Sequence, residues 1–201
     1  MIDWDSTIES EWDLALRKYN DYLVSPEKAA RDARVSLMNA YAISLLSADD
    51  FRSYLHDEFF VWKYTAKNRL ATVRNSFAKM SFSELSEIKN ELVSPALSDR
   101  QLLKSALKIK GLGCAGATAL LSLLYPNRFG TVDQFVVRNL QSANSLNQDP
   151  IIIHAKPNSI KFDVAIRVIK LFQLKANELN VRFGKMTWSP RTIDKAVWAA
   201  R

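Results

Sequence analysis

Apolar residues recur every three or four positions along most of this 201-residue chain, the spacing that gathers them on one face of an α-helix. Near the N-terminus, for example, Ile8, Trp12, Ala15 and Tyr19 fall on a single stripe. The pattern predicts helices over residues 8–22, 25–46, 99–108, 115–125, 133–141 and 159–180, a short helix from residue 81 and a last one from residue 189. A strand is predicted only over residues 150–154, which is too little for a sheet, so we expect an all-α protein.

Several of these helices begin at recognisable capping residues. Ser25 and Ser189 are each followed by proline, and a serine N-cap with proline at the first helical position favours a helix start. Ser81 and Glu84 form the S-x-x-E pattern of a capping box. The caps therefore support the helical interpretation independently of the apolar spacing.

Length and composition indicate a globular chain. It is long enough to bury a core, and 48% hydrophobic with 24% charged residues is ordinary for a folded domain. Apolar runs such as 119–125 are far shorter than the roughly 20 residues that span a bilayer. Segment 1–13 carries five acidic residues and no lysine or arginine, unlike a secretory or organellar leader. We expect one domain over residues 1–201, cytoplasmic and without a membrane partner.

Cysteine and histidine are too few for a structural metal centre. The single cysteine, Cys114, cannot form a disulfide within the chain, and His56 and His154 lie far apart in the sequence. Zinc and iron–sulfur sites require several such ligands together. We therefore expect no metal and no cofactor.

The charge is unevenly distributed. The net charge is +7, but without segment 1–13 the remaining chain carries 28 basic and 16 acidic residues. A surplus of this size favours a polyanionic partner, most often a nucleic acid, although a role in solubility alone would produce the same surplus.

Three of the five glycines, Gly111, Gly113 and Gly116, lie within six residues. Their spacing fits the G-x-G-x-x-G pattern of dinucleotide-binding folds, but that site needs a buried strand before the first glycine, and residues 102–110 are basic and helix-like. A phosphate-binding loop of the G-x-x-x-x-G-K type is also disfavoured, because Ala117 and Thr118 stand where the lysine and serine or threonine belong.

A turn between two helices explains the glycines better. Helices over 102–108 and 115–125 would be joined by a Gly-x-Gly turn, which lets the backbone approach a phosphate closely. The second helix would present its free N–H groups and the positive end of its dipole to the same anion, with Lys108 and Lys110 beside it. A tight turn that binds nothing remains the alternative.

The segment from Ile109 to Arg138 resembles the helix-hairpin-helix DNA glycosylase superfamily. The residues that carry the resemblance are Ile109-Lys110-Gly111-Leu112-Gly113, Ala117-Thr118-Ala119-Leu120-Leu121 and Thr131-Val132-Asp133-Gln134-Phe135-Val136-Val137-Arg138. They match without gaps and cover about 30 of the 201 residues. The resemblance implies a two-lobed helical fold with a cleft between the lobes, a hairpin at about 102–125 and a catalytic aspartate loop at about 129–138.

In that family, the target nucleotide is flipped out of the duplex and its N-glycosidic bond is hydrolysed. The resemblance makes Asp133 the catalytic carboxylate, which would stabilise positive charge on the sugar and orient or deprotonate water. The alternative is that Asp133 serves only as the N-cap of the helix that follows it.

The resemblance and the glycine-rich turn together predict the residues that bind DNA: Lys108, Lys110, Gly111, Gly113, Ala115, Gly116 and Arg138. Ala115 also stands where family members that cut the strand carry a lysine that attacks the sugar. Alanine cannot form that imine, so we expect a monofunctional enzyme that leaves an abasic site.

Aromatic and cationic residues alternate in a second cluster, over residues 59–69. Such residues suit stacking on an extruded base and pairing with phosphate. The resemblance makes Phe59, Trp62, Lys63 and Tyr64 candidates for the base pocket or for the wedge that fills the vacated stack. The aromatic residues could instead belong to the core.

The resulting expectation is a monomeric, monofunctional DNA glycosylase that acts on double-stranded DNA carrying a damaged or modified base. Either base repair or attack on modified phage DNA fits the sequence, and the target base is not defined by it. The alternative is a non-catalytic helix-hairpin-helix DNA-binding module.

Overall fold

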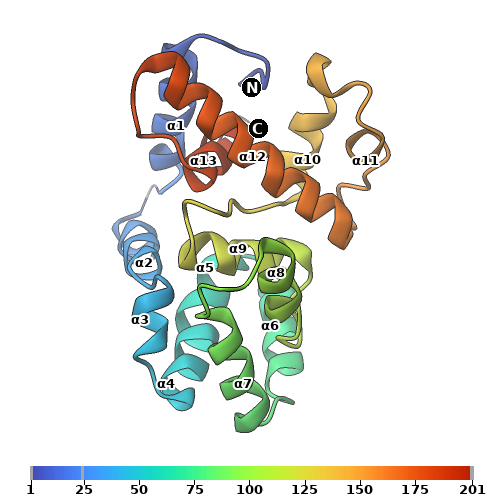
Figure 1. Cartoon of the computed structure of the whole chain (residues 1–201). Coiled ribbons are helices and arrows are strands. Elements are labelled where there is room, and N and C mark those ends of the chain that lie inside the picture. The colour runs from blue at the N-terminus through green and yellow to red at the C-terminus, as the bar shows by residue number, and fades with distance from the viewer. Residues whose placement is uncertain (1, 24, 200–201) are drawn as a thin grey trace. The chain divides into compact units, whose positions relative to one another are not determined.

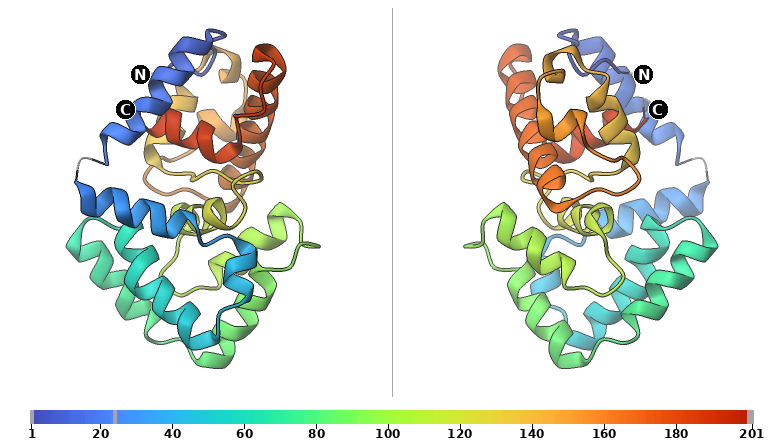
Figure 2. Two further views of the ribbon diagram at one scale, coloured as in Figure 1. Left: turned by 90° about the vertical axis from the view of Figure 1, so that its left-hand side faces the viewer. Right: turned by 90° about the vertical axis from the view of Figure 1, so that its right-hand side faces the viewer.

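The computed structural model describes residues 2–23 and 25–199, and every regular element over those residues is a helix (Figure 1). The all-α prediction is therefore confirmed. The chain divides into two compact units. The terminal unit combines Met1–Val24 with Pro126–Arg201, and the central unit is Ser25–Tyr125. Colour distinguishes them in Figures 1 and 2, since the central unit runs from blue to yellow-green and the terminal unit combines the darkest blue with yellow to red.

The terminal unit is built around two packed pairs of helices, α1 with α13 and α12 with α13. Its elements are α1 (Glu9–Asp21), α10 (Gln134–Gln141), the 3₁₀ turn η2 (Asn144–Leu146), α11 (Pro150–Ile153), α12 (Phe162–Phe183) and α13 (Pro190–Ala199). Trp4, Trp12, Trp188 and Phe172 form an aromatic cluster in its core, with the ring centroids of Trp4 and Trp12 6.3 Å apart. Edge and tilted contacts of this kind stabilise a core beyond simple burial.

The central unit holds the remaining helices. They are α2 (Pro26–Ser36), α3 (Ala40–Ser44), α4 (Ala48–Ser53), the π-helical turn η1 (Tyr54–Phe59), α5 (Phe60–Lys63), α6 (Lys67–Phe77), α7 (Phe82–Leu92), α8 (Asp99–Leu107) and α9 (Cys114–Leu124). Helix α9 is buried along almost its whole length, and α8 packs directly against it. The core of this unit therefore supports the hairpin that α8 and α9 form.

The predicted capping residues occupy their expected positions. The Ser25 side chain accepts a hydrogen bond from the Lys28 amide, and Ser81 forms a complete capping box with Glu84. Ser98 forms a second capping box with Gln101 at the start of α8. Each cap pairs amide groups that the first turn of a helix leaves without an intrahelical acceptor.

The prediction of one helix over residues 25–46 is wrong. Helix α2 ends at Ser36, and α3 starts anew after Asn39, whose side chain accepts from the Ala42 amide. An asparagine that bonds the backbone in this way competes with a continuous helix. Leu37, Tyr41 and other apolar residues of the predicted stripe are accordingly exposed.

The predicted strand over residues 150–154 is also wrong, because α11 occupies this segment. Asp149 caps the helix through the Ile151 and Ile152 amides, and Pro150 takes the first helical position. Isoleucine favours a strand only when neighbouring strands are present to pair with it. Here the local capping residues decide the conformation.

The segment 48–77, for which no helix was predicted, is helical through α4, η1, α5 and α6. The π-helical turn η1 places the His56 carbonyl where the Arg74 guanidinium donates to it, at 2.8 Å from Nη2 and 3.2 Å from Nε. This contact ties α6 to η1. Over the described residues of both units, no helix combines the length and apolarity needed to cross a membrane.

Candidate functional site

The predicted helix–turn–helix is present in the central unit. Helix α8 ends at Leu107, the chain turns through residues 108–113, and α9 begins at Cys114 with Gly113 as its N-cap. No side chain caps α9, and its first turn contains no acidic residue. The first turn of this 11-residue helix therefore supplies no carboxylate of its own to compensate the positive end of the helix dipole.

The three clustered glycines have different roles. Gly111 adopts a left-handed conformation (φ +96°), and a Cβ there would lie 2.9 Å from the Val73 carbonyl oxygen. A Cβ on Gly116 would lie 2.4 Å from the Tyr64 hydroxyl, so this glycine lets the tyrosine pack on α9. Gly113 is exposed, and a Cβ there would meet nothing within 4 Å. Close packing explains why positions 111 and 116 are glycine, whereas Gly113 leaves open space at the start of α9.

Gly111→Ala should destabilise the hairpin strongly. The left-handed conformation and the clash with Val73 together should lower the free energy of unfolding by about 2 to 4 kcal/mol. Urea unfolding of Gly111→Ala beside Gly113→Ala measures this directly. The Gly113 variant serves as the control, since its added methyl meets open space; an equal loss of stability in both would contradict the distinct roles.

The two lysines predicted to meet phosphate lie on the same hairpin and pair with α7. Lys108 Nζ lies 2.6 Å from a Glu91 oxygen, and Lys110 Nζ lies 3.0 Å from a Glu84 oxygen. All four side chains are partly exposed, so these pairs are weak and exchange readily with other partners. The lysines therefore remain available to an external anion at little cost.

Glu84 carries a large pKa shift. Its hydrogen bonds to the Ser81 amide and then to Lys110 lower its pKa from 4.5 to about 2. An acid whose folded pKa is lowered stabilises the native state above its unfolded pKa and loses that contribution as the pH falls through the folded pKa.

Replacement of Glu84 should therefore have a pH-dependent effect on stability. Glu84→Gln should melt at a lower temperature than the wild type at neutral pH, and the difference should shrink between pH 4.5 and about 2. Thermal melts followed by circular dichroism across this range measure it. A difference that stays constant down to the acid end of the range would mean that the charge of Glu84 contributes nothing.

Asp133 lies in the terminal unit, at the start of α10. Its Oδ1 accepts hydrogen bonds from the amides of Phe135 (3.0 Å) and Val136 (3.2 Å), which makes it the N-cap. Among the residues that the structure describes, none donates a hydrogen bond to the second oxygen, Oδ2. The side chain is half-buried, and the backbone of α10 holds one of its two carboxylate oxygens.

The loop that leads to Asp133 is held by side chains that the sequence reasoning missed. Arg191 and Asp194, at the start of α13, form a buried ion pair that bonds Thr131. The only sequence signal for it was the opposite charge of two residues three positions apart at a helix start.

The second cluster is less uniform than predicted. Phe59 is fully buried, and its ring belongs to the core. Burial leaves no face of the ring exposed for stacking on a base, which argues against the predicted role of Phe59 in the pocket or as a wedge. Trp62 is partly buried, donating from Nε1 to an Asp32 oxygen at 2.9 Å. Lys63 is half-buried at the end of α5. Tyr64 packs beside Gly116, where burial raises its pKa to about 12, so the neutral phenol borders the hairpin.

The remaining predicted residues divide between the units. Ala115 lies in the first turn of α9 and is partly exposed, so its methyl group stands beside the open N-terminus. Arg138 is exposed on α10, in the terminal unit with Asp133.

Burial raises the pKa of the Cys114 thiol, which disfavours a reactive thiolate. Among the described residues, no group of three or more histidine, cysteine, aspartate or glutamate side chains could hold a metal ion.

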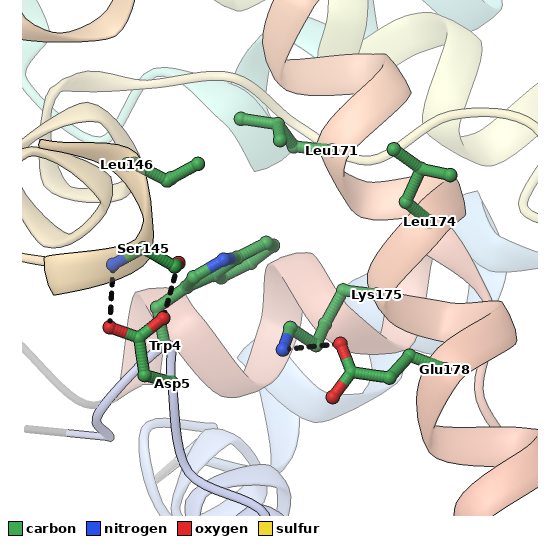
Figure 3. A pocket seen from close by; sticks show the side chains of 8 residues that line it. All are labelled: Trp4, Asp5, Ser145, Leu146, Leu171, Leu174, Lys175 and Glu178. Carbon is green, nitrogen blue, oxygen red and sulfur yellow. Dashed lines mark hydrogen bonds and ion pairs between the residues drawn. The ribbon is translucent and has the colours of Figure 1, made fainter. Parts of the chain in front are cut away.

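The terminal unit also contains a cavity of about 340 Å³ (Figure 3). The charged groups that line it are already paired: Asp5 with the amide and hydroxyl of Ser145, and Lys175 with Glu178 at 2.7 Å. Lys175 also lies over the Trp4 ring, 5.2 Å from its centroid. The charged side chains of the lining are therefore engaged with one another or with neighbouring residues.

Comparisons of this chain with protein-family models, curated proteins and solved structures gave no match.

Proposed function

We propose that this protein is a monofunctional DNA glycosylase. It grips double-stranded DNA through the hairpin of α8 and α9, flips out a damaged or modified base and hydrolyses the N-glycosidic bond with the help of Asp133. The observation that carries the proposal is the Asp133 carboxylate, with Oδ1 fixed by two backbone amides and Oδ2 without a donor among the described residues. An oriented carboxylate with an available oxygen is what charge stabilisation and water activation require.

The proposed grip is electrostatic and independent of sequence. A phosphate would lie against the amides at the start of α9, where Gly113 leaves open space and no acidic side chain competes. Lys108 and Lys110, whose ion pairs with α7 are partly exposed, would exchange their carboxylates for phosphate oxygens. Contacts of this kind position a protein on DNA and leave base selection to other residues.

In the proposed reaction, the bond between C1′ and the base nitrogen breaks and its electron pair leaves with the base. Positive charge develops on the sugar, and the Asp133 carboxylate opposes it. Water then bonds to C1′ through its oxygen, and its proton is transferred through Asp133 or solvent to the departing base. The products are a free base and an abasic site, with the strand intact because Ala115 offers no amine.

One observation favours a second candidate function. The hydrogen bonds of Asp133 to Phe135 and Val136 are those of an ordinary N-cap, which gives this residue a structural role without catalysis. On that basis the protein would be a helix-hairpin-helix DNA-binding module. Both candidates require the same hairpin grip and differ only in turnover.

Formation of abasic sites on a panel of DNAs separates the two candidates. The panel contains duplexes with uracil, oxidised bases or alkylated bases, together with phage genomic DNA that carries modified cytosine. Alkali-labile breaks on one substrate would support the glycosylase. Breaks without alkali would contradict the absence of lyase activity, and tight binding without breaks on any DNA would favour the binding module.

A further inference from the structure

Two buried residues of opposite charge lie together at the start of α13 in the terminal unit. Arg191 is 7% exposed and Asp194 is 2% exposed, and Arg191 Nη1 lies 2.5 Å from Asp194 Oδ2. Removing two charges from water is costly, and a buried pair often contributes little net stability compared with apolar residues of similar size. The contacts that this ion pair makes with the loop before Asp133 indicate what else the pair does.

Both members of the pair bond the segment that leads to Asp133. Asp194 Oδ2 accepts a hydrogen bond from the Thr131 amide at 2.9 Å, and Arg191 Nη1 lies 3.2 Å from Thr131 Oγ1. The Arg191 amide also donates to the Pro126 carbonyl at 3.1 Å. Thr131 is thus held through its backbone and its side chain, two residues before Asp133.

The backbone beside Thr131 is packed against the same turn. A Cβ on Gly130 would lie 2.5 Å from the Pro190 carbonyl oxygen and 2.8 Å from the Asp194 Cβ, so only glycine allows this approach. Phe129 and Val132 are fully buried on either side. The loop therefore has little freedom between its buried residues and the N-cap at Asp133.

Asp133 and Asp194 also lie close enough to influence each other. Burial raises the pKa of Asp194, Arg191 acts against this rise, and the negative charge of Asp133 adds to it. The positive charge of Arg191 therefore offsets part of the rise in the pKa of Asp194.

We propose that Arg191 and Asp194 are positioning residues for Asp133: they hold Thr131 so that the Asp133 carboxylate keeps one oxygen on the α10 amides and directs the other to the reaction. Neither side chain touches the substrate in this account, and both act through the loop. The effect on turnover rests on the proposed function, whereas the effect on the loop does not.

The test replaces both charges at once. The double variant Arg191→Met with Asp194→Leu replaces both charges with apolar side chains, so no buried charge is left without its partner and the variant should remain folded. Loss of the acceptor of the buried Thr131 amide should lower its melting temperature by several degrees. The N-cap should loosen, and hydrogen exchange of the Phe135 and Val136 amides should quicken at least about fivefold. Turnover on bound DNA should fall roughly 100-fold at unchanged DNA affinity.

A matched pair in the same unit provides the control. Lys175 and Glu178 are also three residues apart and joined at 2.7 Å, as Figure 3 shows. Lys175 lies over the rings of Trp4 and Trp12, and its ion pair joins it to Glu178 rather than to Thr131 or Asp133. Lys175→Met with Glu178→Gln should leave exchange at Phe135 and Val136 unchanged. If this control quickens exchange equally, the effect is one of general stability and the proposal is wrong.

The remaining outcomes are also decisive. A folded double variant with wild-type exchange at Phe135 and Val136 would overturn the proposal. If the double variant does not fold, Thr131→Val, which removes the bond from Arg191 to the hydroxyl and keeps the amide bond to Asp194, decides by the same exchange measurement. If the wild type excises no base from any DNA, the proposed function fails, while the exchange measurement still tests the positioning.

Discussion

Asp133→Asn should lower base excision about 1,000-fold and leave the fold and the DNA affinity unchanged. Asparagine caps a helix as well as aspartate does, so the bonds to the Phe135 and Val136 amides persist through its carbonyl oxygen. The variant therefore removes the negative charge without removing the cap. Single-turnover excision, DNA binding and thermal melting, measured on the same preparation, give the three quantities.

Asp149 offers the control for this substitution. It caps α11 in the same unit through the amides of Ile151 and Ile152, the same pattern of bonds to the second and third following residues that Asp133 makes. Asp149→Asn should leave excision unchanged, although it weakens the ion pair with Arg167. Equal turnover in Asp133→Asn and the wild type would show that Asp133 serves only as a cap.

Gly113→Asp should stabilise the protein slightly while lowering its DNA affinity at least about tenfold. Gly113 has ordinary extended geometry (φ −91°, ψ −177°), and a Cβ there meets nothing within 4 Å, so the new side chain fits. Aspartate would cap the α9 amides and complement the helix dipole, with a gain of about 0.5 kcal/mol. The same carboxylate would occupy the place proposed for a phosphate and repel it.

Gly113→Ser separates charge from size in this experiment. Serine also caps the helix but carries no charge, so its DNA affinity should fall less than that of the aspartate variant. The difference between the two variants should shrink as salt is added, because screening weakens the repulsion. DNA binding by Gly113→Asp equal to that of the wild type at low salt would contradict the hairpin grip.

Much of the fold could be predicted because its signals are local. Serine caps at residues 25, 81 and 189 and the apolar spacing of α1, α8, α9 and α12 depend on residues within one or two turns. The wrong predictions also concern local signals. Asn39 ends one helix and starts another, and Asp149 with Pro150 starts a helix where three isoleucines suggested a strand.

The candidate site was only partly accessible to sequence reasoning. The hairpin and Asp133 are marked by glycine spacing and by a short contiguous motif. Burial of Phe59, the packing of Tyr64 on Gly116 and the anchoring of Thr131 by Arg191 and Asp194 depend on contacts between residues distant in the sequence. No local pattern predicts such contacts, because they arise only when the helices pack.

The most direct measurement is mass spectrometry of the free base that the wild-type protein releases from the DNA panel. The account predicts one intact base, released in the same amount as the abasic sites that form, and none from the same DNA with Asp133→Asn. A wild-type protein that binds these DNAs tightly and releases no base from any of them would contradict the assignment of a glycosylase.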